Sequence, residues 1–280
     1  MNRFDNDTRM LPLEQGRMAG HVHATWSIGG NPNGGYLLSL AVAALREAAD
    51  GHRDPLSVTA HYLRPGLAGQ PCTVDTTLLR SGRALSTLRG TLTQEGVARV
   101  EVLAAMGDLG EPAPPVLTLA APRIPAPDDC VPRSDTQQGI MLPLLEVLDI
   151  RLDPSTQPLA TAGNGGAAAR MAGWIRFRDG RVPDALACML FADAFPPAVF
   201  SLLGAVGWVP TIELTVHLRA RPAPGWMLGQ FHTVDLQDGR LVEDGALWDS
   251  QGTLVAQSRQ LALLLDPARR PRQRTALTAQ

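Results

Sequence analysis

Two stretches of the chain are apolar around almost the whole circumference of a helix. Residues 34–49 (GGYLLSLAVAALREAA) place Leu, Ala and Val on every side of a helical wheel. Residues 183–195 (PDALACMLFADAF) repeat the pattern, and Pro183 suits a helix start. A helix that is apolar nearly all round is usually buried. The pattern therefore predicts one long buried helix in each half of the chain.

Short segments rich in apolar and β-branched residues, separated by turns that contain Gly, follow each predicted helix. They cover residues 57–66, 72–82, 84–96 and 97–107 in the first half, and 208–222, 226–239, 240–252 and 253–265 in the second, where strands are also expected over 144–152 and 172–180. Such spacing is typical of an antiparallel meander. We therefore predict an α+β fold, a double hotdog in which two antiparallel sheets each wrap a long buried helix.

The segment between the halves has a Pro every few positions (LGEPAPPVLTLAAPRIPAPDD), which prevents a regular ladder of hydrogen bonds. We expect an N-terminal hotdog domain over 1–107, an extended linker over 108–140 and a C-terminal hotdog domain over 141–267. The last residues, 268–280, are expected to form a disordered tail.

Composition narrows the chemistry. The chain is 45% hydrophobic and 19% charged, with a net charge of −2, which favours a soluble globular protein and gives no reason to expect a nucleic-acid partner. Apolar runs fall short of the roughly 20 residues that span a bilayer, so no membrane insertion is expected. Residues 1–16 lack the apolar core of a signal peptide, and we expect a cytoplasmic protein.

All 25 basic residues are Arg, so chemistry that requires a lysine is excluded: Schiff-base enzymes, P-loop hydrolases and Ser-Lys nucleophiles. The G-x-S-x-G pattern of common serine hydrolases is absent from the sequence. Three scattered cysteines do not suggest a zinc site or a disulfide framework. Residues 163–168 fit a loose dinucleotide fingerprint, but no clear strand precedes them, and we interpret 161–169 as a loop.

Asp193 is the one carboxylate in an almost wholly apolar stretch, residues 188–200. A charged Asp is rarely buried without partners, because its removal from water costs several kcal/mol unless other groups compensate. Two interpretations follow from the local sequence. Either Asp193 has a catalytic role, or the chain turns it to solvent at the end of the helix.

Several motifs, in this order and spacing, resemble the bacterial acyl-CoA thioesterase II family and its thioesterase-like relatives. The similarity covers nearly the whole chain outside the linker. The residues that carry it are Gly29 to Tyr36 (GGNPNGGY), Leu63 to Gly66 (LRPG), Gly82-Arg83 before Leu85-Ser86, Ala192-Asp193, Thr211-Ile212-Glu213, Arg221-Pro222, Trp226 and Leu254-Val255-Ala256 followed by Gln260.

The resemblance implies a catalytic set of Asp193, Thr211 and Gln260 that positions a water against a thioester carbonyl. The chemistry suits these residue types, because a carboxylate can take the proton of an attacking water while a hydroxyl and an amide orient it. Glu213 stands where the most similar family members have Asp.

Further binding residues are expected by position. Gly34 and Gly35 would let the backbone approach the ligand closely. His61 would line the groove, and Arg64 would meet the phosphates of coenzyme A. The substrate implied is an acyl-CoA, with no metal or redox cofactor, and the exposed sheet edges favour a homodimer or larger homo-oligomer.

Other functions on the same fold stay open. The protein could be a non-catalytic acyl- or CoA-binding protein, or a thioesterase that acts on acyl carrier protein. A hotdog hydratase is disfavoured, because residues 194–200 contain no His to pair with Asp193.

Overall fold

The computed structural model describes residues 2–14, 16–49, 51–110, 114–135, 139–156, 169–204 and 209–265. The loose fingerprint at 163–168 and the expected tail at 268–280 lie outside the described residues, as does the expected loop at 161–169 except for its last residue.

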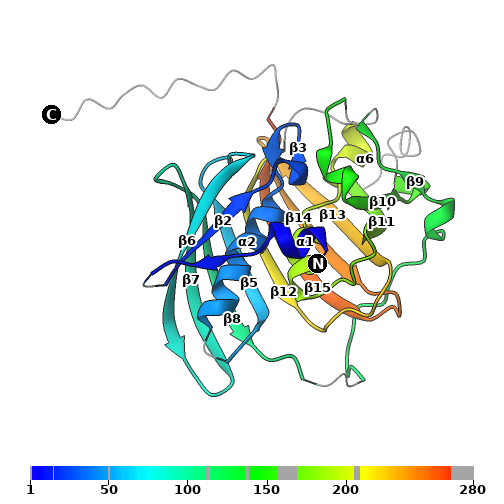
Figure 1. Cartoon of the computed structure of the whole chain (residues 1–280). Helices are drawn as coiled ribbons and strands as arrows, with labels where there is room; N and C mark the ends of the chain where they lie inside the picture. The colour runs from blue at the N-terminus through cyan, green and yellow to red at the C-terminus, as the bar shows by residue number, and fades with distance from the viewer. Residues whose placement is uncertain are drawn as a thin grey trace.

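Thirteen of the strands in the described residues form one continuous antiparallel sheet (Figure 1). The sequence predicted two sheets, and this is the main difference in architecture. The order is β1-β2-β6-β7-β8-β5-β12-β15-β14-β13-β11-β10-β9. In each half three consecutive strands form a meander, and the strand before them in the sequence, β5 or β12, lies at the centre of the sheet and pairs with the last of the three, β8 or β15. The bounds of the first half are β1 Leu11–Pro12, β2 Arg17–Val22, β5 Asp54–Tyr62, β6 Gln70–Ser81, β7 Leu85–Gln94 and β8 Val97–Gly107. Those of the second are β9 Val131–Pro132, β10 Leu148–Leu152, β11 Ala169–Phe177, β12 Thr211–Leu218, β13 Met227–Gln237, β14 Arg240–Trp248 and β15 Leu254–Leu263.

The halves join through β5 and β12, which pair antiparallel from Glu213 opposite His61 to His217 opposite Ser57. The hydroxyls of Thr59 and Thr215 lie 2.9 Å apart across this seam. Strand alternation sets the faces: Leu214, Val216 and Leu218 of β12 are buried, and the residues between them point outward.

The first predicted helix is confirmed as α2, Gly34–Ala48, which lies inside the curve of the N-terminal sheet (Figure 1). Ten of its residues are buried, as an apolar circumference requires. Asn33 caps its start, because the Asn33 side chain accepts a hydrogen bond of 2.9 Å from Tyr36 N.

The second helix, α5, covers only Ala185–Phe191, so the prediction of a long helix over 183–195 was wrong about its length. Asp184 is the N-cap and Pro183 precedes it. Pro196 and Pro197 set the outer limit of the helix, because a residue before proline avoids helical geometry and proline donates no backbone hydrogen bond. The helix ends earlier, at Phe191, and the residues after it bond to the start of α2. Asp193 therefore lies in a turn. The other described helices are short, α1 Arg3–Asp7 and α6 Phe200–Leu203. Single 3-10 turns lie at η1 Ala24–Trp26, η2 Pro127–Asp129, η3 Pro143–Glu146 and η4 Pro154–Thr156. A separate two-stranded ladder joins β3 Ser27–Ile28 to β4 Asn31–Pro32.

Helices α2 and α5 touch at Gly35. A Cβ atom on Gly35 would lie 2.6 Å from Met189 O and 2.8 Å from Leu190 O, so only glycine permits this approach. The contact brings the N-terminus of α2 onto the turn that follows α5.

The segment expected as a linker, 108–140, is partly built into the C-terminal half. Its residues Val131–Pro132 form β9 and pair with β10 at the edge of the sheet. Farther back, the indoles of Trp248 and Trp174 donate hydrogen bonds of 2.9 Å to the carbonyls of Leu119 and Pro125. The domain boundaries stay a prediction, but these contacts hold the segment to the C-terminal half at several points.

Candidate active site

A cavity of about 510 Å³ lies between the two halves, where the α2 N-terminus meets the turn after α5. Most of its wall is apolar, with Ile28, Leu37, Phe195, Phe200, Val209, Ile212, Phe231 and Leu263. Its polar side chains come from both halves: Asn31, Asn33, Tyr62, Arg64, Arg133, Asp193, Thr211, Glu243 and Gln260. An apolar cavity with a few converging polar groups is the usual form of a small-molecule site.

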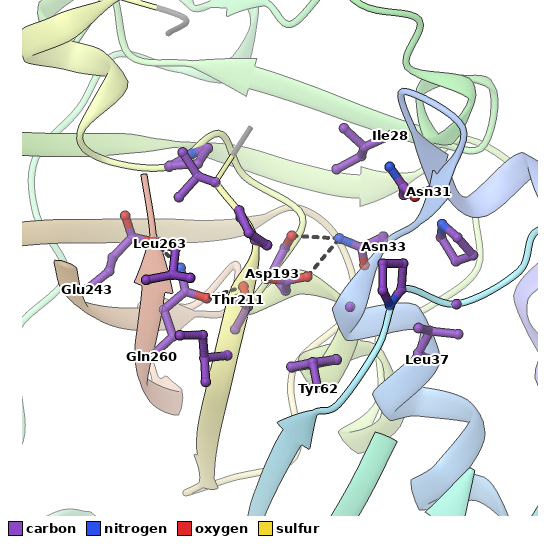
Figure 2. Close-up of a pocket in the computed structure, with 18 of the residues that line it drawn as sticks. Ile28, Asn31, Asn33, Leu37, Tyr62, Asp193, Thr211, Glu243, Gln260 and Leu263 are labelled. Carbon is purple, nitrogen blue, oxygen red and sulfur yellow. Dashed lines mark hydrogen bonds between the residues drawn. The ribbon is translucent and has the colours of Figure 1, made fainter. Parts of the chain in front are cut away.

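Asp193 is partly buried in the wall of this cavity, which decides against the interpretation that it faces solvent. Its Oδ2 accepts hydrogen bonds of 2.9 Å from the Asn33 side-chain amide and from Gly35 N. The same Asn33 amide also donates to the Asp193 carbonyl at 2.8 Å (Figure 2). These bonds hold the Asp193 side chain in the wall of the cavity.

Burial raises the pKa of Asp193 to about 6, although hydrogen bonds from Gly35, Gly34 and Asn33 act in the opposite direction. Removal from water disfavours the charged form, and donors to the carboxylate favour it. The result is a carboxylate that is largely ionised at neutral pH yet basic enough to accept a proton.

Thr211 and Gln260 lie beside Asp193, so the structure brings the three expected catalytic residues together (Figure 2). Thr211 begins β12, and its hydroxyl donates to Gln260 Oε1 at 3.2 Å. Gln260 is buried in the adjacent strand β15. The roles of the three side chains remain predictions, but their convergence from distant parts of the sequence meets the geometric requirement.

Glu243 is a second carboxylate at the cavity that sequence reasoning missed. It is 5% exposed, and its carboxylate accepts hydrogen bonds from Gln260 Nε2 at 3.0 Å and from Ala198 N. Burial raises the pKa of Glu243 to about 7, and the nearby negative charge of Asp193 adds to the effect. A sequence signal existed, because Glu243 shares the inward face of β14 with buried Leu241 and Leu247.

Arg133 was missed because it falls in the segment taken for a linker. It is buried in the cavity wall and donates a hydrogen bond to the carbonyl of Ala194, next to Asp193. Burial lowers the pKa of Arg133 to about 9, while the charges of Asp193 and Asp135 raise it. Asn33 was quoted as part of a motif but given no role, and the structure makes it the main side-chain donor to Asp193.

The four expected substrate-binding residues occupy different places. Gly34 and Arg64 line the cavity. Gly35 does not, because it packs against α5 and gives its N–H to Asp193 instead of to a ligand. His61 is exposed on the opposite face of β5, and its neighbour Tyr62 points to the cavity, since side chains alternate along a strand.

Glu213 is also outside the cavity wall as described. Its carboxylate accepts a hydrogen bond from the Thr215 hydroxyl, and the residue pairs with His61 across the seam. Glu213 is therefore not part of the group formed by Asp193, Thr211 and Gln260.

Fold and site together define a double hotdog protein with a carboxylate, a hydroxyl and an amide at one end of an apolar cavity. Comparison with known proteins gives the family. Residues 22–110 match the acyl-CoA thioesterase N-terminal domain and residues 127–264 match the acyl-CoA thioesterase C-terminal domain, so the chain belongs to the acyl-CoA thioesterase family.

Individual relatives agree. An uncharacterized protein of Mycobacterium tuberculosis is 32% identical over 274 residues, which cover 88% of this chain and 90% of that protein. The crystal structure of a proposed thioesterase II from Thermobifida fusca is 32% identical and superposes with a TM-score of 0.84 over 95% of this chain and 98% of its own. An acyl-CoA thioesterase II from Mycobacterium marinum, 20% identical, has a TM-score of 0.70 over 95% of this chain and 99% of its own and supports the fold.

Among the described residues, no helix is long and apolar enough to cross a membrane, and no cluster of His, Cys, Asp and Glu has the arrangement of a metal site.

Proposed function

We propose that this protein hydrolyses the thioester of a fatty or related acyl-CoA, with a water molecule activated by Asp193. The observation that supports this most directly is the Asp193 carboxylate, held at the apolar cavity with a pKa near 6 and flanked by Thr211 and Gln260. A general base works best when its pKa lies near the working pH.

In the proposed reaction the water donates one hydrogen bond to Asp193 and another to Gln260 Oε1. These two bonds turn a lone pair of the water oxygen toward the carbonyl carbon of the thioester. As the water oxygen bonds to that carbon, its proton passes to Asp193. The C–S bond then breaks, and the coenzyme A sulfur leaves as a thiol after it takes up the proton. Thr211 donates its one hydroxyl proton to Gln260 Oε1, which keeps that oxygen in place to accept from the water.

The rest of the cavity suits the two ends of such a substrate. The acyl chain would lie against the aromatic part of the wall, Phe195, Phe200 and Phe231. Arg64, exposed at the rim, would face the phosphates of coenzyme A.

The test is thiol release from a panel of acyl-CoA chain lengths, with the native protein, Asp193→Asn and the control Asp238→Asn. Loss of a general base should lower kcat by about 10²-fold or more. Asp238 lies in an exposed turn, and its variant should retain native activity.

If the native protein releases no thiol from any acyl-CoA, the proposal fails in this form. Binding of acyl-CoA without turnover would then support an acyl-binding protein. Turnover of acyl carrier protein thioesters alone would support a carrier-protein thioesterase.

A further inference from the structure

Glu243 has no task in the reaction as written, yet its two carboxylate oxygens are both engaged. Its Oε2 accepts from Ala198 N and its Oε1 accepts from Gln260 Nε2 at 3.0 Å. Because the side chain is buried, these partners rather than water determine its arrangement.

A glutamine amide has an accepting oxygen at one end and a donating NH₂ at the other, and a half-turn exchanges them. An ionised carboxylate can only accept. Ionised Glu243 therefore fixes the NH₂ of Gln260 on its own side and leaves Gln260 Oε1 toward Thr211 (Figure 2). The opposite orientation would direct NH₂ into the cavity, where it would bond to the lone pair with which a water must attack.

We infer that Glu243 is a positioning residue that sets the orientation of the Gln260 amide and thereby the direction of the attacking water. The inference rests on the proposed function. It also implies that hydrolysis requires ionised Glu243, since a protonated carboxyl can donate to Gln260 and removes the preference.

The charges around Glu243 bear on this requirement. Asp193 faces it across the cavity, Asp244 follows it in β14, and Arg133 lines the same cavity from the segment after β9. Burial and the two carboxylates keep the pKa of Glu243 near 7, within the range in which hydrolysis would be assayed.

The variant Glu243→Gln tests the orientation. The N–H of Ala198 still needs an acceptor, so the new amide turns its oxygen there and its NH₂ toward Gln260, which is forced to turn over. We expect kcat to fall by about tenfold or more with little change in KM, because misplacement of a reacting group acts on the chemical step. When two carboxylates must be ionised, the plot of log kcat against pH approaches a slope of about two on its acid side. In Glu243→Gln that slope should fall to about one.

The exchange variant Glu243→Gln with Gln260→Glu separates orientation from other causes. The amide introduced at position 243 can then donate to the carboxylate introduced at position 260, which again presents an accepting oxygen to Thr211. Above about pH 8 both carboxylates of this variant, Asp193 and the one at position 260, are ionised. Its kcat there should exceed that of Glu243→Gln by at least about threefold, because the orientation of the accepting oxygen is restored. Native kcat and an unchanged acid limb in Glu243→Gln would overturn the inference, and so would an exchange variant no faster than Glu243→Gln.

A measurement without turnover keeps this test apart from the proposed function. In ¹⁵N-labelled Asp193→Asn protein, the side-chain amide signal of Gln260, identified by its loss in Gln260→Glu, should shift as Glu243 titrates, at a pH below 7 because the charge of Asp193 no longer raises its pKa. That shift should vanish when Glu243→Gln is added. A signal that ignores pH in both proteins would overturn the inference even if no acyl-CoA is hydrolysed.

Discussion

The two halves use the same pattern, a capped apolar helix before a meander, but they differ in the length of the helix. Helix α2 runs for 15 residues and α5 for 7. Both begin with a side-chain cap, Asn33 on Tyr36 N and Asp184 on Ala187 N. The difference lies at the C-terminal end, where α5 gives way to a turn ahead of Pro196.

That turn places Asp193 on the N-terminus of α2, where free backbone N–H groups and the helix dipole favour a negative charge. The N-terminal half thus supplies the hydrogen-bond donors Asn33 and Gly35, and the C-terminal half supplies the side chains of Asp193, Thr211 and Gln260. The shorter helix is the one that ends beside the candidate site.

We expect the largest loss of stability from a larger side chain at Gly35, where α2 and α5 touch. Gly35→Val puts side-chain atoms into the carbonyls of Met189 and Leu190 and should destabilise the protein by about 3 kcal/mol, at the upper end for overpacking. Urea unfolding measures this. Gly110→Ala, whose added Cβ meets no atom within 4 Å, is the matched control and should leave stability unchanged.

Asp193 should cost stability when it is ionised. Its folded pKa is raised from 3.8 to about 6, so the folded protein binds its proton more tightly, and stability is lost as pH rises through 6. Asp193→Asn should therefore stabilise the protein at about pH 8 by roughly 2 kcal/mol and hardly at all at about pH 4. Thermal unfolding at both pH values checks the sign, and equal effects at the two pH values would contradict the burial argument.

Asn33 joins the halves by capping α2 and donating to Asp193. Asn33→Ala should lose about 1 kcal/mol of stability through the cap. It should also move the acid limb of activity to higher pH, because Asp193 loses a donor that favours its charged form. Asn33→Ser keeps a capping oxygen but removes the amide donor, so a pH shift in both variants with the larger loss of stability in Asn33→Ala would separate the two roles.

The smallest effect should come from the seam. Thr59→Val removes the hydrogen bond to Thr215 but keeps the β-branched shape, at a cost of about 0.5–1 kcal/mol. Urea unfolding should show one transition in native and variant protein alike. Two transitions would mean that the halves unfold separately despite the continuous sheet.

Much of this fold can be predicted from periodicity. The apolar circumference of residues 34–48 and the alternation in the strands reflect burial, which acts residue by residue and is therefore written locally in the sequence. The length of α5 and the joining of two sheets into one are less accessible, because they depend on contacts between the halves, such as Gly35 against Met189.

The site divides in the same way. The motifs led to Asp193, Thr211 and Gln260, whose convergence the structure supports. The alternation of buried and exposed positions along the strands could have shown that Glu243 of β14 points to the interior. The same alternation in β5 would have placed His61 on the exposed face. Arg133 gave no such signal, because an extended Pro-rich segment has no periodicity from which to infer its buried side.

The anchored segment between the halves has a consequence for assembly. Asp193 comes from one half and its donors Asn33 and Gly35 from the other, so neither half alone holds the complete candidate site. A covalent connection keeps the second half at an effective concentration of roughly millimolar, far above that of separate chains in a cell. If the chain were cut between Leu119 and Pro125, the proposed hydrolysis should decline on dilution, because the two pieces would separate. The hydrogen bonds of Trp248 to Leu119 and of Trp174 to Pro125 would then hold the two cut ends to the C-terminal half.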